Sequence, residues 1–183
     1  SDLMGLWHLN GNGNDSRGRE NQGIETGTIE YSACLWGTTC FDYGSGNEYY
    51  IVDNSNSDFN FTSDFSVSAW VNVDVEGGYI FAKDSAAGGD RGYYLATGVG
   101  YYRFFASDAG TNLVHYTVSH EVDDGLWQHI IGVYDSSVPE MRMYVDGSRA
   151  YGTQIGTVTS SIHNSNAVTY IGRTTSGAQY NGK

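Results

Sequence analysis

The sequence predicts an all-β protein, a sandwich or barrel of short strands that forms a single domain. Short apolar or alternating segments recur at intervals of roughly 8 to 15 residues, with Gly, Ser, Thr and Asn between them. No stretch keeps a 3.6-residue hydrophobic period long enough for a helix of about three turns. A chain of 183 residues is long enough to bury one core without further support.

The clearest strand is the segment 65–73, in which every second residue is apolar. Its predicted core face consists of Phe65, Val67, Ala69, Val71 and Val73. A second strand is predicted at 127–134, with His129 packed in the core on the same face as Ile131 and Val133.

A hairpin is predicted around Asp146-Gly147, a dipeptide favoured in two-residue turns. It joins the strand 141–145 to a partner that begins near Arg149. The remaining strands are predicted at 6–9, 40–43, 49–52, 79–83, 93–97, 102–107, 114–119 and 168–171.

The charge balance argues against nucleic acid as a partner. The net charge is −12, and the only lysines are Lys83 and Lys183. Phosphate binding needs clustered Lys and Arg, which no segment provides. Anionic membranes are disfavoured for the same reason, and no run of about 18 apolar residues predicts membrane insertion.

The two cysteines bear on the cellular compartment. Cys34 and Cys40 lie in a Gly/Thr loop, where two strand ends of a hairpin could bring them to bonding distance. We expect a disulfide, with a pair of free buried thiols as the alternative, whereas zinc is excluded because no second Cys or His pair has zinc spacing. A disulfide favours an extracellular or cell-surface location, and the N-terminus is expected to follow a removed signal peptide.

Six segments, in order, resemble the laminin-G-like jelly rolls of the concanavalin A-like lectin/glucanase superfamily. They are LWHLNGNGNDS at 6–16, FDYG with YYIV at 41–52, FSVSAWV at 65–71, GLWQHIIGVYD at 125–135, MYVDG at 143–147 and YIGR at 170–173. The resemblance implies one two-sheet antiparallel jelly-roll β-sandwich over residues 1–183. The superfamily contains lectins, adhesins and enzymes, so the fold alone does not fix the function.

The departure from the family pattern lies at the C-terminus. The family continues into an Ile-Asp-Asp strand, whereas this sequence ends at Tyr180-Asn181-Gly182-Lys183, apparently without its final strand. Either the chain is a fragment, or a strand from another molecule fills the open sheet edge.

The resemblance also implies a structural calcium ion near the loop that contains Asn12 and Asp15. Side-chain oxygens and exposed carbonyls suit calcium, although the spacing is not that of an EF-hand. The alternative is that the Asn and Asp side chains bind their own backbone in Asx-turns.

Catalytic residues are not predicted. A glycosidase needs two carboxylates across a cleft, and the closest approach to this is Asp74 with Glu76 beside a Gly-Gly turn. We interpret that pair as a solvated turn, so a polysaccharide-active enzyme is the least favoured hypothesis.

Carbohydrate binding uses aromatic faces and planar polar groups, which the segment 101–105 supplies most densely. If the core-facing residues of this strand are Tyr102, Phe104 and Ala106, then Tyr101, Arg103 and Phe105 face outward. Trp36 is a second candidate, and ordinary sheet packing is the alternative for all four.

The leading hypothesis is therefore a non-catalytic extracellular recognition or adhesion domain that binds a glycan or another cell-surface ligand. The rival is a structural subunit of a filament or surface layer that self-associates through the open edge.

Overall fold

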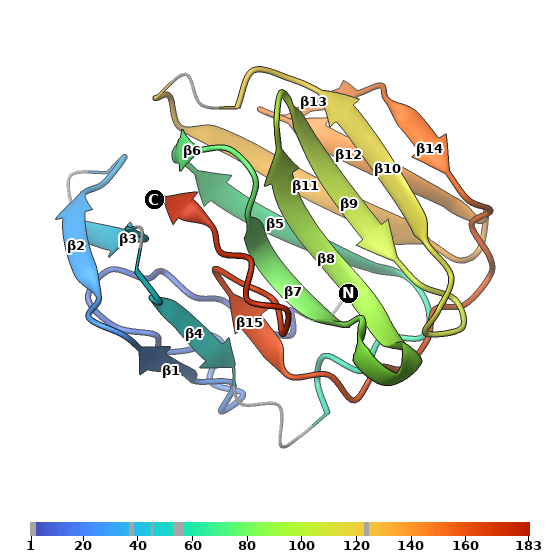
Figure 1. Cartoon of the computed structure of the whole chain (residues 1–183), viewed down its shortest axis with the longest axis horizontal. Helices are drawn as coiled ribbons and strands as arrows, with labels where there is room; N and C mark the ends of the chain where they lie inside the picture. Colours follow the sequence, from blue (N-terminus) through green and yellow to red (C-terminus); the bar gives the residue numbers. More distant parts are fainter. Residues whose placement is uncertain (1–2, 37–38, 45, 53–56, 123–124) are drawn as a thin grey trace.

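The computed structural model describes residues 3–36, 39–44, 46–52, 57–122 and 125–183, which form a sandwich of two antiparallel β-sheets (Figure 1). The larger sheet has eight strands. In spatial order they are β1 (Gly23–Thr26), β4 (Tyr49–Val52), β15 (Thr169–Ile171), β7 (Tyr79–Ser85), β8 (Asp90–Gly98), β9 (Tyr101–Ala106), β10 (Val114–Ser119) and β14 (Thr153–Ile155).

The smaller sheet has four strands and lies behind the large one in Figure 1. Its order is β13 (Ser148–Ala150), β12 (Glu140–Val145), β11 (Gln128–Asp135) and β5 (Phe65–Val71). The remaining strands form two separate two-stranded sheets. One pairs β2 (Glu30–Ala33) with β3 (Thr39–Asp42), and the other pairs β6 (Val73–Val75) with β16 (Asn181–Gly182). A single 3-10 turn, η1 (Ala87–Gly89), precedes β8.

The core lies between the two sheets and is strongly aromatic. Phe65 of β5 packs against Tyr93 of β8 and Phe104 of β9, with ring centroids 4.6 and 5.7 Å apart. Gly132 of β11 makes room for this packing, because a Cβ atom there would lie 2.4 Å from the Phe104 ring. Alternate residues of each strand therefore meet in the core, and their neighbours form the two outer faces.

The β8–β9 hairpin fixes which residues become neighbours on the outer face of the large sheet. Its two-residue turn, Val99-Gly100, pairs Gly98 with Tyr101, Ala96 with Arg103 and Tyr94 with Phe105. Pairing of β9 with β10 then sets His115 opposite Phe105.

The structure confirms the all-β sandwich and most predicted strands. The Asp146-Gly147 turn joins β12 to β13, with φ angles of 49° and 77° at its two residues. The predicted strand at 6–9 was wrong, since only an isolated bridge between Trp7 and Asp15 occurs there. The predicted strand at 65–73 is divided at Asn72 into β5 and β6.

The position predicted for His129 was also wrong. The buried residues of β11 are Gln128, Ile130, Gly132 and Tyr134, so His129 and its neighbour Ile131 lie on the outer face of the small sheet.

The last residues of the chain already lie in a strand. Lys183 exchanges two backbone hydrogen bonds of 2.7 Å with Asn72, and Gly182 exchanges two with Tyr43. The segment 181–183 therefore lies between β6 and the end of β3, and its last residue bonds to Asn72, which directly follows the edge strand β5.

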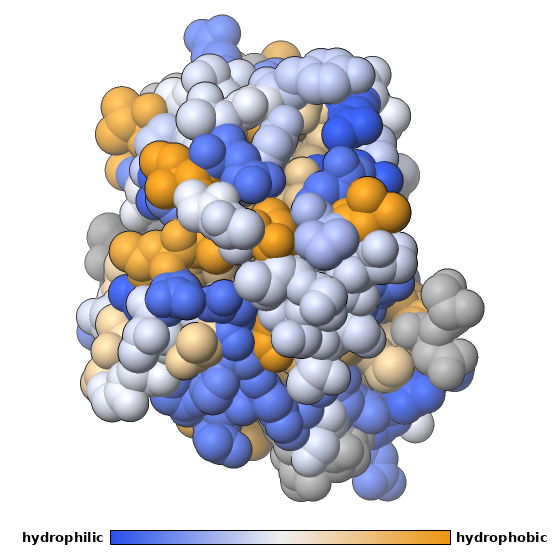
Figure 2. Space-filling model, turned by 90° about the vertical axis from the view of Figure 1, so that its right-hand side faces the viewer, coloured by the Kyte–Doolittle hydropathy of each residue, from blue (hydrophilic) through white to orange (hydrophobic). Residues whose placement is uncertain are grey.

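The outer surface is mixed in polarity. On the side that carries β10 and β14, hydrophobic residues occur in separate groups among hydrophilic ones (Figure 2). Among the described residues, no helix has the length and hydrophobicity that crossing a membrane requires.

Candidate functional site on the outer face of the large sheet

Strand β9 presents two different faces, as its alternation predicted. Tyr102, Phe104 and Ala106 belong to the core between the sheets. Phe105 belongs instead to a small second cluster with Tyr94, Ala96 and Ala82 on the outer face. The outward set of β9 therefore joins residues of β7 and β8 rather than standing alone.

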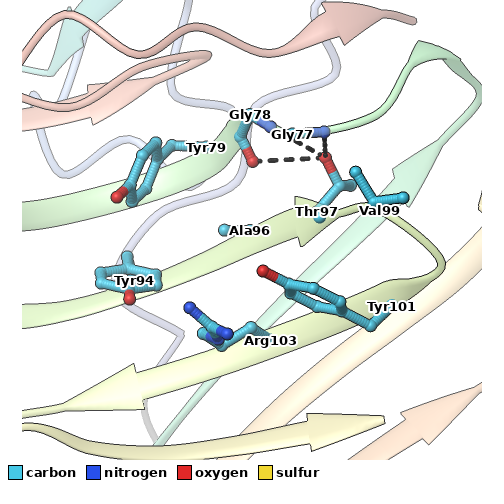
Figure 3. Close-up of a pocket in the computed structure, with 10 residues that line it drawn as sticks. Gly77, Gly78, Tyr79, Tyr94, Ala96, Thr97, Val99, Tyr101 and Arg103 are labelled. Carbon is cyan, nitrogen blue, oxygen red and sulfur yellow. Dashed lines mark hydrogen bonds between the residues drawn. The ribbon is translucent and has the colours of Figure 1, made fainter. Parts of the chain in front are cut away.

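A pocket of about 270 Å³ lies on this outer face, at the end of the β8–β9 hairpin (Figure 3). Its floor is made of small residues, and aromatic side chains and one arginine surround it. The lining consists of Gly77, Gly78, Tyr79, Tyr94, Ala96, Thr97, Gly98, Val99, Tyr101 and Arg103. The volume is close to the lower end of the range for small-molecule sites, about 300–1,000 Å³.

Thr97 fixes one wall of the pocket. Its hydroxyl oxygen accepts the N–H groups of Gly77 at 3.2 Å and Gly78 at 3.0 Å, as Figure 3 shows. On the same side, the Glu76 carboxylate accepts the N–H of Gly100 at 2.6 Å. These bonds hold the turn between β6 and β7 against the β8–β9 hairpin, so the pocket wall is preorganised.

The charged side chain of the pocket is Arg103, which lies between Tyr94 and Tyr101 (Figure 3). Its guanidinium carbon is 4.8 Å from the Tyr101 ring centroid, a cation–π contact. Its Nε donates a hydrogen bond to the Thr117 hydroxyl at 3.3 Å. The arginine is thus held against the sheet while its outer edge faces the pocket.

Two tyrosines of the pocket, Tyr79 and Tyr94, keep their hydroxyl protons at neutral pH. Burial, with a smaller contribution from Tyr79, raises the pKa of Tyr94 to about 12. Burial and the negative charge of Asp84 also raise the pKa of Tyr79. Each hydroxyl therefore stays uncharged and offers a ligand one donor and acceptor.

Of the three outward residues predicted on β9, Tyr101 and Arg103 line the pocket, but Phe105 does not. Phe105 lies on the predicted face yet is only 1% exposed. It stacks on Tyr94 at 4.5 Å, and Arg91 covers it at 5.5 Å. Phe105 therefore supports the Tyr94 ring rather than offering a surface to a ligand.

Trp36 lies on the other side of the sandwich. It is 65% exposed and makes an edge contact of 5.2 Å with Trp70, which is itself 42% exposed on the outer face of β5. Trp70 stacks on His129 at 4.9 Å, and the His129 ring bonds to the Ser68 hydroxyl at 2.7 Å. The structure thus does not bring Trp36 together with Tyr101 and Arg103.

The side chains of Asn12 and Asp15 are engaged by backbone N–H groups. The Asp15 carboxylate accepts those of Leu6, Arg17 and Arg19 at 2.9–3.3 Å, and the Asn12 side-chain oxygen accepts that of Asn14 at 2.9 Å. These oxygens do not fit a calcium site, which needs several free oxygens. Within the described ranges, no group of three His, Cys, Asp or Glu is arranged for a metal. Calcium binding stays a prediction that this loop does not favour.

Cys34 and Cys40 are free thiols in the structure. They lie at the end of the β2–β3 hairpin, in which Ser32 pairs with Cys40. Burial and a hydrogen bond with Cys34 raise the pKa of Cys40 to about 12. The thiols are therefore neighbours, and the disulfide stays a prediction.

Asp74 and Glu76 do not form a pair across a cleft. Asp74 is exposed on β6, and the Glu76 carboxylate binds Gly100 as described above. This geometry matches the solvated-turn interpretation.

The sequence interpretation missed Tyr79 and Tyr94. For Tyr94 the available signal was the short Val99-Gly100 connection. It sets the register of the hairpin, which places Tyr94 opposite Phe105 and Ala96 opposite Arg103.

Residues 44–183 match the family described as the concanavalin A-like lectin/glucanases superfamily. Among curated proteins, none matches the chain significantly.

Several solved structures have the same fold at low sequence identity. The binding domain of Paraclostridial Mosquitocidal Protein 1 aligns with a TM-score of 0.69 and 15% identity, covering 91% of this chain and 43% of that one. A structure described as "Cell entry of botulinum neurotoxin type C is dependent upon interaction with two ganglioside molecules" aligns with a TM-score of 0.63 and 17% identity, covering 92% and 40%. The binding domain of botulinum neurotoxin DC in complex with SialylT aligns with a TM-score of 0.64 and 16% identity, covering 92% of this chain and 41% of that one. The chain thus spans about two fifths of these structures, and the likeness concerns the fold.

Proposed function

The chain belongs to the concanavalin A-like lectin/glucanases superfamily, and from this membership and its outer-face pocket we propose that it is a non-catalytic extracellular recognition domain that binds a saccharide. Tyr94, Tyr101 and Arg103 make the proposed contacts. The observation that carries the proposal is a sugar-sized hollow with a small-residue floor between tyrosine rings and a guanidinium.

The chemistry of the pocket matches that of a sugar ring. Tyrosine faces pack against the CH groups of a pyranose, while hydroxyl and guanidinium groups bond its hydroxyls. Two of the structurally similar domains are described with a ganglioside or with SialylT, which supports a glycan as the ligand class. The acidic, lysine-poor composition argues against a nucleic-acid partner, because phosphate binding needs clustered basic residues.

A glycan array followed by calorimetry on the wild-type protein tests the proposal. Tyr101→Ala is expected to weaken binding of the array ligand several-fold or more, since aromatic contacts contribute about 0.5–1.5 kcal/mol beyond area burial. Tyr151→Ala is the matched control, because Tyr151 is 79% exposed and also carries an arginine, Arg149, over its ring at 5.4 Å. An array without any ligand, or equal losses in both variants, would contradict the proposal.

The second candidate function is assembly through a sheet edge. The observation that favours it is that β5 is an edge strand of the small sheet. Unpaired strand edges accept strands from other molecules. We test it by light scattering of the protein with its native C-terminal continuation: concentration-dependent polymers support a filament or layer subunit, and a monomer at high concentration counts against it.

A further inference from the structure

Arg103, like Arg17 and Arg173, forms no ion pair with a carboxylate among the described residues, which distinguishes it from the other four arginines. Arg19, Arg91, Arg142 and Arg149 each form an ion pair with a carboxylate. For Arg103, the described residues include no carboxylate within ion-pair distance. Its contacts are the Thr117 hydroxyl, the Tyr101 ring and the Tyr94 side chain. None of these partners is a carboxylate, so no ion pair neutralises the positive charge of Arg103.

This charge acts on a neighbouring residue. Burial and, second, the charge of Arg103 lower the pKa of His115, which pairs with Phe105 and so lies two residues along the β9–β10 ladder from Arg103. His115 therefore stays neutral at physiological pH and supplies no competing charge. The outer face thus carries a local positive site on a protein whose net charge is −12.

Two carboxylates near the pocket have partners other than Arg103. Asp84 is 3.6 Å from Arg91, and Glu76 binds the backbone N–H of Gly100. More distant carboxylates are screened, since the Debye length is about 8 Å at physiological ionic strength. An anionic group that reaches the pocket therefore meets Arg103 directly.

We propose that the pocket selects saccharides that carry a carboxylate, with Arg103 binding the carboxylate and the Tyr101 ring packing against the sugar. This inference rests on the proposed saccharide-binding function. A guanidinium has five N–H donors in a planar fork that matches the two carboxylate oxygens, and Thr117 engages only Nε. The small floor residue Ala96, which pairs with Arg103, leaves space for the sugar ring above the sheet.

The test compares matched sugars that differ by one charge. Binding of oligogalacturonate, methyl glucuronide and sialyllactose is measured beside that of their methyl esters, by calorimetry and by NMR shifts of the protein. At least one free acid is expected to bind about tenfold or more tightly than its ester, because a hydrogen bond to a charged group contributes about 1.5–3 kcal/mol. The preference should also fall as salt is raised.

Two substitutions assign the preference to Arg103. Arg103→Gln is expected to remove the difference between acid and ester, and Arg103→Lys to keep part of it. Arg149→Gln is the control, since Arg149 stacks on a tyrosine outside the pocket. Thermal unfolding of each variant checks that the fold is intact.

The outcomes separate the inference from the function on which it rests. If esters and neutral sugars bind as tightly as acids and Tyr101→Ala weakens them all, saccharide binding stands and acid selectivity is wrong. A preference for acids that survives in Arg103→Gln also overturns the inference. If no saccharide, acidic or neutral, binds the wild-type protein, both proposals fail.

Discussion

Ala96 and Gly98 lie side by side on the outer face of β8, opposite Arg103 and Tyr101 of β9. Their lack of bulk creates the hollow, and larger residues at either position would fill it. At Gly98 the fit is tightest, because an added Cβ would lie 2.0 Å from the far end of the Tyr101 ring. The shape of the pocket thus depends on its smallest residues as well as on its aromatic ones.

We therefore predict that Gly98→Ala displaces the Tyr101 ring and weakens saccharide binding several-fold, while the fold remains intact. The clash involves the end of a half-exposed side chain, which can rotate away. Calorimetry and thermal unfolding measure the two effects. Gly44→Ala is the control, since nothing lies within 4 Å of its added Cβ. Unchanged affinity in Gly98→Ala would show that Tyr101 does not contact the ligand.

The N-terminal loop gives a second prediction at this scale. Asp15 is buried, and its carboxylate accepts three backbone N–H groups. Asp15→Ala leaves these donors without their partner, so we expect a loss of about 1–3 kcal/mol in the free energy of unfolding. Chemical denaturation with EDTA and with calcium measures it. If the role is structural, the loss is the same in both conditions, whereas a calcium site would make only the wild-type protein respond to EDTA.

Single residues also show the limit of prediction from sequence. Alternation along one strand placed Tyr101 and Arg103 on the outer face, as the structure does, because the face of a residue depends only on its own strand. Tyr79 and Tyr94 come from other strands, and their place beside Arg103 depends on strand pairing. Phe105 was placed on the right face, but its burial depends on Tyr94 and Arg91.

At the scale of whole elements, the β2–β3 hairpin places two thiols together at the surface end of a two-stranded unit. Its two strands belong to neither the large nor the small sheet. A disulfide would therefore restrain a segment that has few other backbone hydrogen bonds to the rest of the sandwich. In the chain-entropy model, so short a loop contributes only about 2 kcal/mol.

We predict that the protein isolated under oxidising conditions lacks two hydrogens of mass relative to the reduced form, as a Cys34–Cys40 disulfide requires. After reduction, iodoacetamide should label Cys34 before Cys40, because the raised pKa of Cys40 leaves little thiolate at pH 8. Mass spectrometry of timed samples measures both. Equal labelling rates would contradict the raised pKa of Cys40, and an oxidised sample with both thiols free would contradict the disulfide.

The wrong face predicted for β11 has a physical reason within the element. The face was predicted from its apolar side chains, and the face with Ile131 and Val133 looked more apolar than the face that contains Gly132, which is the buried one. Gly132 has no side chain because Phe104 of the opposite sheet occupies the space. Short strands such as β1, β14 and β16 were not predicted, since their neighbours' hydrogen bonds define them rather than a pattern of their own.

Across the whole molecule, the position of each strand should determine how strongly its amides are protected from exchange. β8 and β9 lie inside the eight-stranded sheet and β11 inside the smaller one, all three with partners on both sides. β13 and β14 are short edge strands. Amides of interior strands exchange only through global unfolding, whereas edge amides exchange through local opening. We therefore expect the slowest hydrogen exchange in β8, β9 and β11.

Gly132→Ala tests whether the two sheets unfold together. Its added methyl group collides with the Phe104 ring between the sheets, so we expect overpacking to cost about 1–3 kcal/mol. Because the core that joins β11 to β8 and β9 is continuous, protection should fall by the same free energy in all three strands and hardly change in β13 and β14. Hydrogen exchange measured by mass spectrometry at peptide resolution gives both quantities. A loss confined to β11 would mean that the small sheet opens separately, and the sandwich would then unfold as two units.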